Sequence, residues 1–113
     1  MIGYKGHKNR EYKHLRYKTG ETYELTDEKL KSYGFGYHFC KNFLDVNDYY
    51  NFEDDSIVIY EVETLGQIRI IREDNLYSTD KMIVLREIPR SEWEKLSDGL
   101  YKIGTGLENN EKR

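Results

Sequence analysis

His38 and Cys40 are the side chains of this sequence best suited to nucleophilic chemistry. They lie two positions apart in a segment that predicts a β-strand, so both side chains point to the same face. A cysteine beside a histidine can act as a nucleophile, with Asp45 or Asp48 orienting the imidazole. Such a dyad needs an exposed thiol with a lowered pKa. We favour the competing interpretation, in which Cys40 is a small buried apolar residue and His38 is structural, and we predict no catalytic residue.

Metal binding would have to use the three histidines, His7, His14 and His38, together with carboxylates. No two of these histidines have the spacing by which a helix or a turn brings metal ligands together. We therefore predict no metal site, and no motif indicates another cofactor.

Charge is distributed unevenly along the chain, although the net charge is only −3. Residues 1–18 contain six basic side chains against one acid, Glu11. Residues 42–68 contain seven acids and no lysine or arginine. Either the two segments pair with each other in the fold, or one of them faces a partner.

The acidic segment supports the hypothesis of a protein partner. Carboxylates and tyrosines on a rigid helix and turn can imitate a phosphate backbone and occupy the cationic groove of a nucleic-acid-binding protein. The predicted contact residues are Asp48, Tyr49, Tyr50, Glu53, Asp54 and Asp55. The basic segment, in which tyrosines alternate with cations, supports the alternative of direct nucleic-acid binding.

The elements that must position these residues form one domain, because the chain has only 113 residues. We predict an α+β domain over residues 1–107, with a largely antiparallel sheet of about six short strands and three short helices. A polar tail, residues 108–113, is expected to be disordered. The expected strands lie at 2–6, 14–18, 22–25, 36–40, 57–63, 67–72 and 81–88.

Capping signals place the helices. The first is expected between Thr26 and Gly34, and the second runs from Phe43 to Tyr50 with Asn42 as its cap. Within the second, Phe43, Val46 and Tyr50 have the spacing of one apolar face. A capping box of Ser91 and Glu94 begins the third, which we expect to run through Ser97 and to be terminated by Gly99. Residues 73–80 predict a loop because they include Asn, Ser and Asp.

Cysteine content and hydropathy bear on the compartment. One cysteine excludes an intramolecular disulfide and suits a reducing cytoplasm. The N-terminus has no apolar run typical of a signal peptide, and no apolar stretch is long enough to span a membrane. We expect a cytoplasmic protein, and its many tyrosines and strong strands leave a homodimer open.

Several motifs together resemble an uncharacterised family of small phage and prophage proteins. These motifs are Tyr4-Lys5-Gly6, the block Tyr37-His38-Phe39-Cys40 with Asn42, Leu44 and Tyr49-Tyr50, the turn Leu65-Gly66, and Thr79-Asp80-Lys81. The chain departs from the family's pattern at Tyr37, where phenylalanine is usual, and at Phe43, where proline is common. The resemblance implies a phage-type accessory protein that acts inside a bacterium. In that context, the acidic segment leads to our hypothesis of a protein that binds and inhibits or redirects a bacterial host protein, such as a defence nuclease.

A second resemblance is to the mono-ADP-ribosyltransferase fold. Tyr4-Lys5-Gly6, the strand from Gly36 to Phe39 and the helix to Tyr50 follow the order of elements around nicotinamide in those enzymes. This resemblance implies a cleft for NAD or ADP-ribose near Tyr4, Gly6 and His38. It does not single out a catalytic glutamate, for which Glu61, Glu63 and Glu87 are equal candidates.

Overall fold

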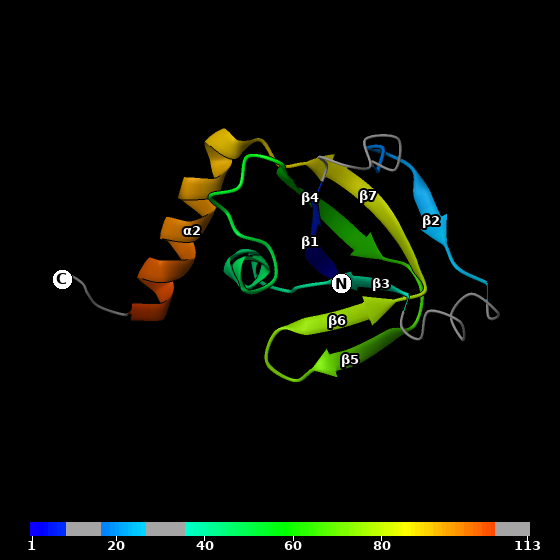
Figure 1. Cartoon of the computed structure of the whole chain (residues 1–113). Helices are drawn as coiled ribbons and strands as arrows, with labels where there is room; N and C mark the ends of the chain where they lie inside the picture. Colours follow the sequence, from blue (N-terminus) through cyan, green and yellow to red (C-terminus); the bar gives the residue numbers. More distant parts are fainter. Residues whose placement is uncertain (9–16, 27–35, 106–113) are drawn as a thin grey trace.

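The computed structural model describes residues 1–8, 17–26 and 36–105, with the side chains of its last helix described as far as Ser97. Two helices lie in these ranges, the 3₁₀ helix η2 (Phe43–Asp48) and α2 (Arg90–Thr105), as Figure 1 shows. Seven strands accompany them: β1 (Ile2–Lys8), β2 (Thr22–Glu24), β3 (Tyr37–Phe39), β4 (Ile57–Thr64), β5 (Ile68–Arg72), β6 (Leu76–Thr79) and β7 (Lys81–Glu87).

The strands form two antiparallel sheets that meet at β1 and β3. The first sheet has the order β1-β4-β7-β2, and the second has the order β3-β6-β5. An isolated antiparallel bridge between Tyr4 and Cys40 joins β1 to β3. The small domain is thus mostly antiparallel sheet with few helices, as predicted. Two helices are described where three were expected, and the one expected between Thr26 and Gly34 falls on residues outside the described ranges.

The strand predictions are correct for most of the sheet and wrong for β6. Residues 76–79 form this strand although polar residues 73–80 predicted a loop. Pairing with β3 on one side and β5 on the other overrides the local signal, and the ring of Tyr77 stacks on Phe39. A strand expected at 14–18 lies mainly outside the described residues, and Tyr17 and Lys18 are not in a strand. The tail at 108–113 is likewise outside them.

Both described helices differ from the prediction, the first in its type and cap and the second in its first and last residues. η2 is a 3₁₀ helix, and the side chain of Asn42 makes no cap hydrogen bond to it. α2 contains Ser91 and begins one residue earlier, where the Glu92 N–H donates to the Pro89 carbonyl at 2.9 Å. It also continues through Gly99 to Thr105. A glycine inside a helix costs only about 1 kcal/mol relative to alanine, so it weakens a helix without ending it.

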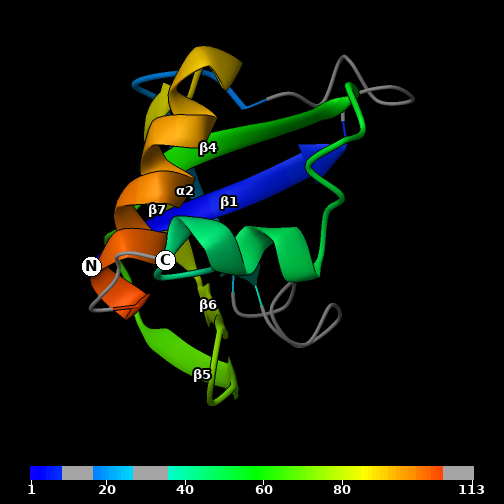
Figure 2. The ribbon, with the colours of Figure 1, turned by 90° about the vertical axis from the view of Figure 1, so that its left-hand side faces the viewer.

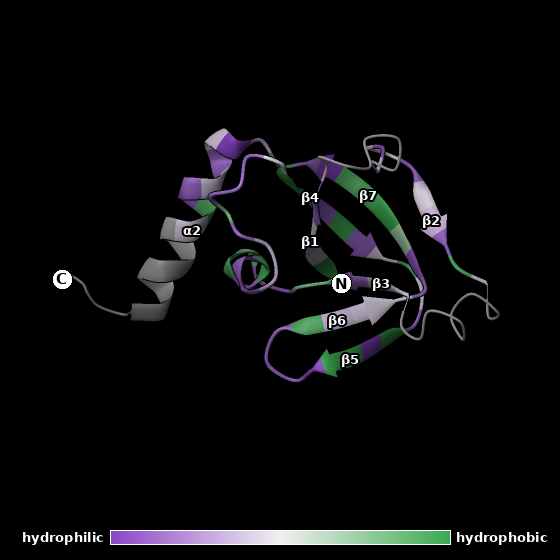
Figure 3. Ribbon diagram, viewed as in Figure 1, coloured by the Kyte–Doolittle hydropathy of each residue, from purple (hydrophilic) through white to green (hydrophobic). Residues whose placement is uncertain are grey.

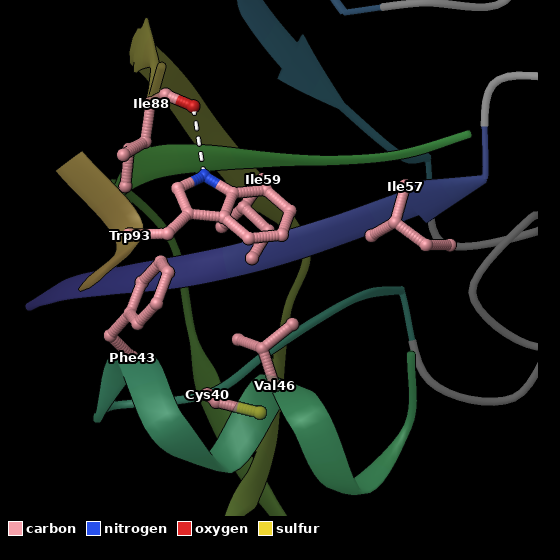
Figure 4. Packing of buried hydrophobic residues seen from close by; sticks show 7 residues of the cluster. All are labelled: Cys40, Phe43, Val46, Ile57, Ile59, Ile88 and Trp93. Atoms are coloured by element: carbon pink, nitrogen blue, oxygen red, sulfur yellow. Dashed lines mark hydrogen bonds between the residues drawn. The ribbon is translucent and has the colours of Figure 1, made fainter. Parts of the chain in front are cut away.

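An apolar core lies between the first sheet and the two helices. Figure 2 shows η2 and α2 on the same side of β1 and β4. Figure 4 shows the buried side chains of this core, with the indole N–H of Trp93 donating to the Ile88 carbonyl at 3.1 Å. Its members are Cys40, Phe43, Val46, Ile57, Ile59, Ile88 and Trp93.

A second core lies on the opposite face of β4. Because side chains alternate along a strand, Ile57 and Ile59 join the first core, while Tyr60 and Val62 join the second with Phe39, Met82 and Val84. Figure 3 shows this alternation on β4 and also apolar residues on the edge strand β5, where Ile70 is 64% exposed. No helix in the described ranges is long and apolar enough to cross a membrane.

Candidate functional site

A pocket of about 370 Å³ lies where β1 and β3 part, beside η2. Its walls come from β1, from β3 and the residue after it, from η2 and the two residues after it, and from β6. The lining residues are Tyr4, Lys5, Gly6, His38, Phe39, Cys40, Val46, Tyr49, Tyr50 and Leu76. The three residues predicted for a nucleotide cleft, Tyr4, Gly6 and His38, therefore line one pocket.

The end of a short backbone ladder creates this pocket. Tyr4 and Cys40 exchange two backbone hydrogen bonds, at 2.7 and 2.8 Å. In a longer antiparallel ladder the next such pair would be Gly6 with His38. The ladder stops before that pair, and the His38 carbonyl instead accepts a hydrogen bond from Lys5 Nζ at 2.8 Å.

Gly6 therefore directs two backbone groups toward the pocket. Residues two apart on a strand direct their N–H and C=O to the same side, so those of Gly6 point toward β3, as those of Tyr4 do. In the described part of the chain, no hydrogen bond to Gly6 exists on that side. These groups form a donor and an acceptor beside each other, with the geometry that a further strand or an amide-like ligand requires.

Only glycine fits at position 6. A Cβ atom there would clash with the ring of Tyr50, which follows η2 and lies directly on the strand. Burial raises the pKa of the Tyr50 hydroxyl, with a smaller contribution from Cys40, so this group is a neutral phenol. The strand and the ring thus pack closely at one wall of the pocket. A Cβ atom at Gly3 would likewise clash with the ring of Phe39.

Lys5 is a partly buried cation beside aromatic rings. Its Nζ lies 5.7 Å from the ring centre of Tyr17 and 5.9 Å from that of Tyr37. Burial lowers the pKa of Lys5 to about 8 because loss of water disfavours the charged form. None of the ion pairs in the described ranges involves Lys5.

The geometry does not favour a nucleophilic dyad. Cys40 is 3% exposed, and burial, with Asp45 and Asp48 adding to it, raises the pKa of its thiol to about 12. A reactive cysteine needs the opposite shift. Burial and the charge of Lys5 lower the pKa of His38. Cys40 packs in the first core, which agrees with the structural interpretation.

The predicted partner-binding residues divide into two places. Tyr49 and Tyr50 line the pocket. Tyr49 also donates its hydroxyl hydrogen to Asn75 Oδ1, and Asn75 Nδ2 donates to the carboxylate of Asp48 at 2.6 Å. Asn75 thus ties the end of η2 to the turn between β5 and β6.

The remaining three, Glu53, Asp54 and Asp55, lie in the acidic turn before β4. Asp54 Oδ1 accepts hydrogen bonds from the backbone N–H of Ser56 at 2.9 Å and from its hydroxyl at 2.7 Å. Lys8 Nζ lies 3.5 Å from the other carboxylate oxygen. Asp54 is therefore a structural residue of the turn, whereas the side chains of Glu53 and Asp55 are exposed.

Two further features of the charged segments follow from these contacts. Arg90 of α2 clamps the acidic turn by donating to the backbone carbonyls of Phe52, Asp54 and Ile57. The ion pair of Lys8 with Asp54 shows that the basic and acidic segments meet in the fold. With Lys5 also partly buried, two of the six N-terminal cations are engaged within the domain.

Sequence reasoning missed several pocket residues, notably Lys5, Phe39, Val46 and Leu76. Leu76 was missed because its strand was predicted as a loop. Lys5 was missed because alternation along β1 places its side chain on the face opposite that of Tyr4. The motif Tyr4-Lys5-Gly6 was the available signal, since it places a cation between two pocket residues.

Comparison with known proteins gives a family. The family model described as Domain of unknown function (DUF7666) matches residues 1–96. The chain belongs to the DUF7666 family. No curated protein and no solved structure matches it. The matched residues include every residue of the pocket and the whole acidic turn.

The acidic turn of this DUF7666 protein predicts a specific response to acid. The hydrogen bonds from the side chain and then the backbone of Ser56 lower the pKa of Asp54 to about 2. Because this folded-state pKa lies below the unfolded value of about 3.9, ionised Asp54 stabilises the fold above pH 4, roughly, and that stabilisation is lost as the pH falls toward 2.

We expect Ser56→Ala to raise the pKa of Asp54 toward its ordinary value, while Ser56→Thr, which keeps a hydroxyl, changes it little. NMR titration of the Asp54 carboxyl between pH 1.5 and 6 measures both variants. An unchanged titration in Ser56→Ala would contradict the role given to the hydroxyl.

Proposed function

We propose that this DUF7666 domain binds a small planar ligand in the pocket where β1 and β3 part, and that this ligand is a nucleotide such as NAD or ADP-ribose. The observation that carries the proposal is the pair of backbone groups of Gly6, which face the pocket between tyrosine side chains. The resemblance to mono-ADP-ribosyltransferases motivates the choice of nucleotide.

The size and lining of the pocket support this proposal. Ligand sites in proteins are concave, mostly apolar and about 300–1,000 Å³ in volume, with a few placed polar groups. At about 370 Å³ the pocket can hold one ring system of a nucleotide. Its apolar walls include Phe39, Val46 and Leu76, and its polar groups include Lys5 and His38.

Each group has a distinct role in such a complex. The ring of the ligand stacks on a tyrosine, for which Tyr49 is the most accessible at 36% exposed. The polar edge of the ring donates to the Gly6 carbonyl and accepts from the Gly6 N–H, as a neighbouring strand would. Lys5 adds positive charge beside the site, which favours an anionic ligand.

Paired substitutions at Tyr49 test the stacking role. We expect Tyr49→Ala to weaken binding of NAD or AMP by roughly tenfold, because stacking of an aromatic side chain on a base contributes about 1–3 kcal/mol. Tyr49→Phe keeps the ring and loses only the hydrogen bond to Asn75, so its affinity should stay close to that of the natural protein.

Chemical-shift titration of the ¹⁵N-labelled protein measures these affinities. The Gly6 and Tyr50 amides should shift on addition of the nucleotide. Spectra that do not change at millimolar NAD, ADP-ribose or AMP would overturn the proposal.

A second candidate function, suggested by the resemblance to small phage proteins, is the binding of a cationic bacterial host protein such as a defence nuclease. It is supported by the rigidity of the acidic turn, which Arg90 clamps through three backbone carbonyls. Glu53 and Asp55 are exposed on this turn. Carboxylates held in place lose little entropy when a cationic surface binds them.

The two kinds of carboxylate in this turn give a matched test. Glu53→Lys with Asp55→Lys should leave the free energy of unfolding within about 0.5 kcal/mol, as exposed surface substitutions usually do, and abolish capture of the partner. Asp54→Lys should lower the melting temperature, because it removes the hydrogen bonds from Ser56.

Capture is measured with the tagged protein in nuclease-treated bacterial lysate, at low and high salt. A stoichiometric partner lost at high salt and lost in the double variant is the expected result. A partner that the double variant retains in full would rule out this face as the contact.

A further inference from the structure

The amine of Lys5 can act as a nucleophile, a property that nucleotide binding does not use. It lines the pocket, its Nζ is anchored to the His38 carbonyl, and no carboxylate in the described ranges pairs with it. We infer that Lys5 is a carbonyl-reactive amine, which forms an imine with an aldehyde or ketone that enters this pocket. The inference rests on the proposed function only in requiring that a small planar molecule can enter.

Burial outweighs the contacts that favour the protonated form of Lys5. The ring faces of Tyr17 and Tyr37 lie within 6 Å of Nζ and attract the cation, yet burial lowers the pKa of the amine. Tyr60 is paired opposite Lys5 on β4. The other titratable neighbours are Cys40 and His38, and the pKa values of both are shifted toward their neutral forms. No carboxylate in the described ranges pairs with the amine, and the contribution of Cys40, which raises the pKa of Lys5, is smaller than the effect of burial.

Burial then gives this lysine a pKa of about 8, against an ordinary value near 10.4. About a tenth of the amine is then unprotonated at pH 7, and an unprotonated fraction of this kind is how a desolvated lysine becomes a nucleophile. The carbonyl oxygen of His38 accepts a hydrogen bond from Nζ at 2.8 Å and thereby orients it.

The reaction is balanced without another reactant. The nitrogen lone pair attacks the carbonyl carbon and forms a carbinolamine. The carbonyl oxygen then leaves as water with the two hydrogens of the neutral amine, and a C=N bond forms. Water reverses the reaction, so the adduct is stable only when a reductant such as cyanoborohydride converts it to a secondary amine.

The test uses the full chain with 4-carboxybenzaldehyde and cyanoborohydride, between pH 6 and 10. Mass spectrometry of peptides cut at sites other than lysine gives the rate at each lysine. Lys41 is the matched internal control, because it is exposed and also lies over one aromatic ring, that of Tyr77. We expect Lys5 to react at least about tenfold faster than Lys41 at pH 7.5, since burial lowers the pKa of Lys5 to about 8 and a desolvated lysine is the better nucleophile.

The rate at Lys5 should rise through about pH 8, following its pKa. Lys5→Arg, which keeps the charge, should lose this one modification and leave those at other lysines unchanged. A Lys5 that reacts no faster than Lys41, in protein with a folded-state NMR spectrum, would overturn the inference.

Adding AMP separates this inference from nucleotide binding. Protection of Lys5 without protection of Lys41 is the result expected if both are correct. A reactive Lys5 that AMP does not protect supports the imine chemistry and counts against the nucleotide. Binding of AMP with an unreactive Lys5 supports the nucleotide and rejects the imine chemistry.

Discussion

The two backbone hydrogen bonds between Tyr4 and Cys40 are the constraint on which the rest of this structure depends, because they form the strand bridge between the two sheets. This single bridge holds β1 against β3, and the two strands separate beyond it. Gly6 and His38, the next residues that would pair, therefore line a pocket and are not bonded to each other. Close packing fixes the geometry on either side. The ring of Tyr50 lies on Gly6 and that of Phe39 on Gly3, so a side chain at either glycine would clash with the ring packed on it.

Two charged contacts complete this arrangement. Lys5 donates to the carbonyl of His38 that a longer ladder would have used, so the parting of the strands does not leave the His38 carbonyl unbonded. Burying a polar group without a partner costs about 1–3 kcal/mol, and this hydrogen bond avoids that cost at the expense of a partly buried cation. Arg90 and Lys8 hold the acidic turn, so the basic and acidic segments meet within the fold.

Local signals in the sequence predict the strands with clear patterns and miss those defined by pairing. β4 alternates in its apolar residues and was predicted almost to its ends, whereas β6 lies in a segment with Asn, Ser and Asp and becomes a strand because β3 and β5 flank it. The grouping of Tyr4, Gly6 and His38 came from a family resemblance, since residues so far apart in sequence carry no spacing signal. The fixed role of Asp54 was not predictable, because an acidic run looks the same whether or not a serine and a lysine engage one carboxylate.

The claim that β1 and β3 part after a single bridge is tested most directly by amide hydrogen exchange at Tyr4 and Gly6. The Tyr4 N–H is bonded to the Cys40 carbonyl at 2.7 Å, so it should exchange slowly, with the protection of the sheet. The Gly6 N–H faces the pocket and should exchange much faster, although it lies only two residues further along the same strand. Equal protection of the two amides in the free protein would mean that the ladder continues past Tyr4, and the pocket described here would not exist.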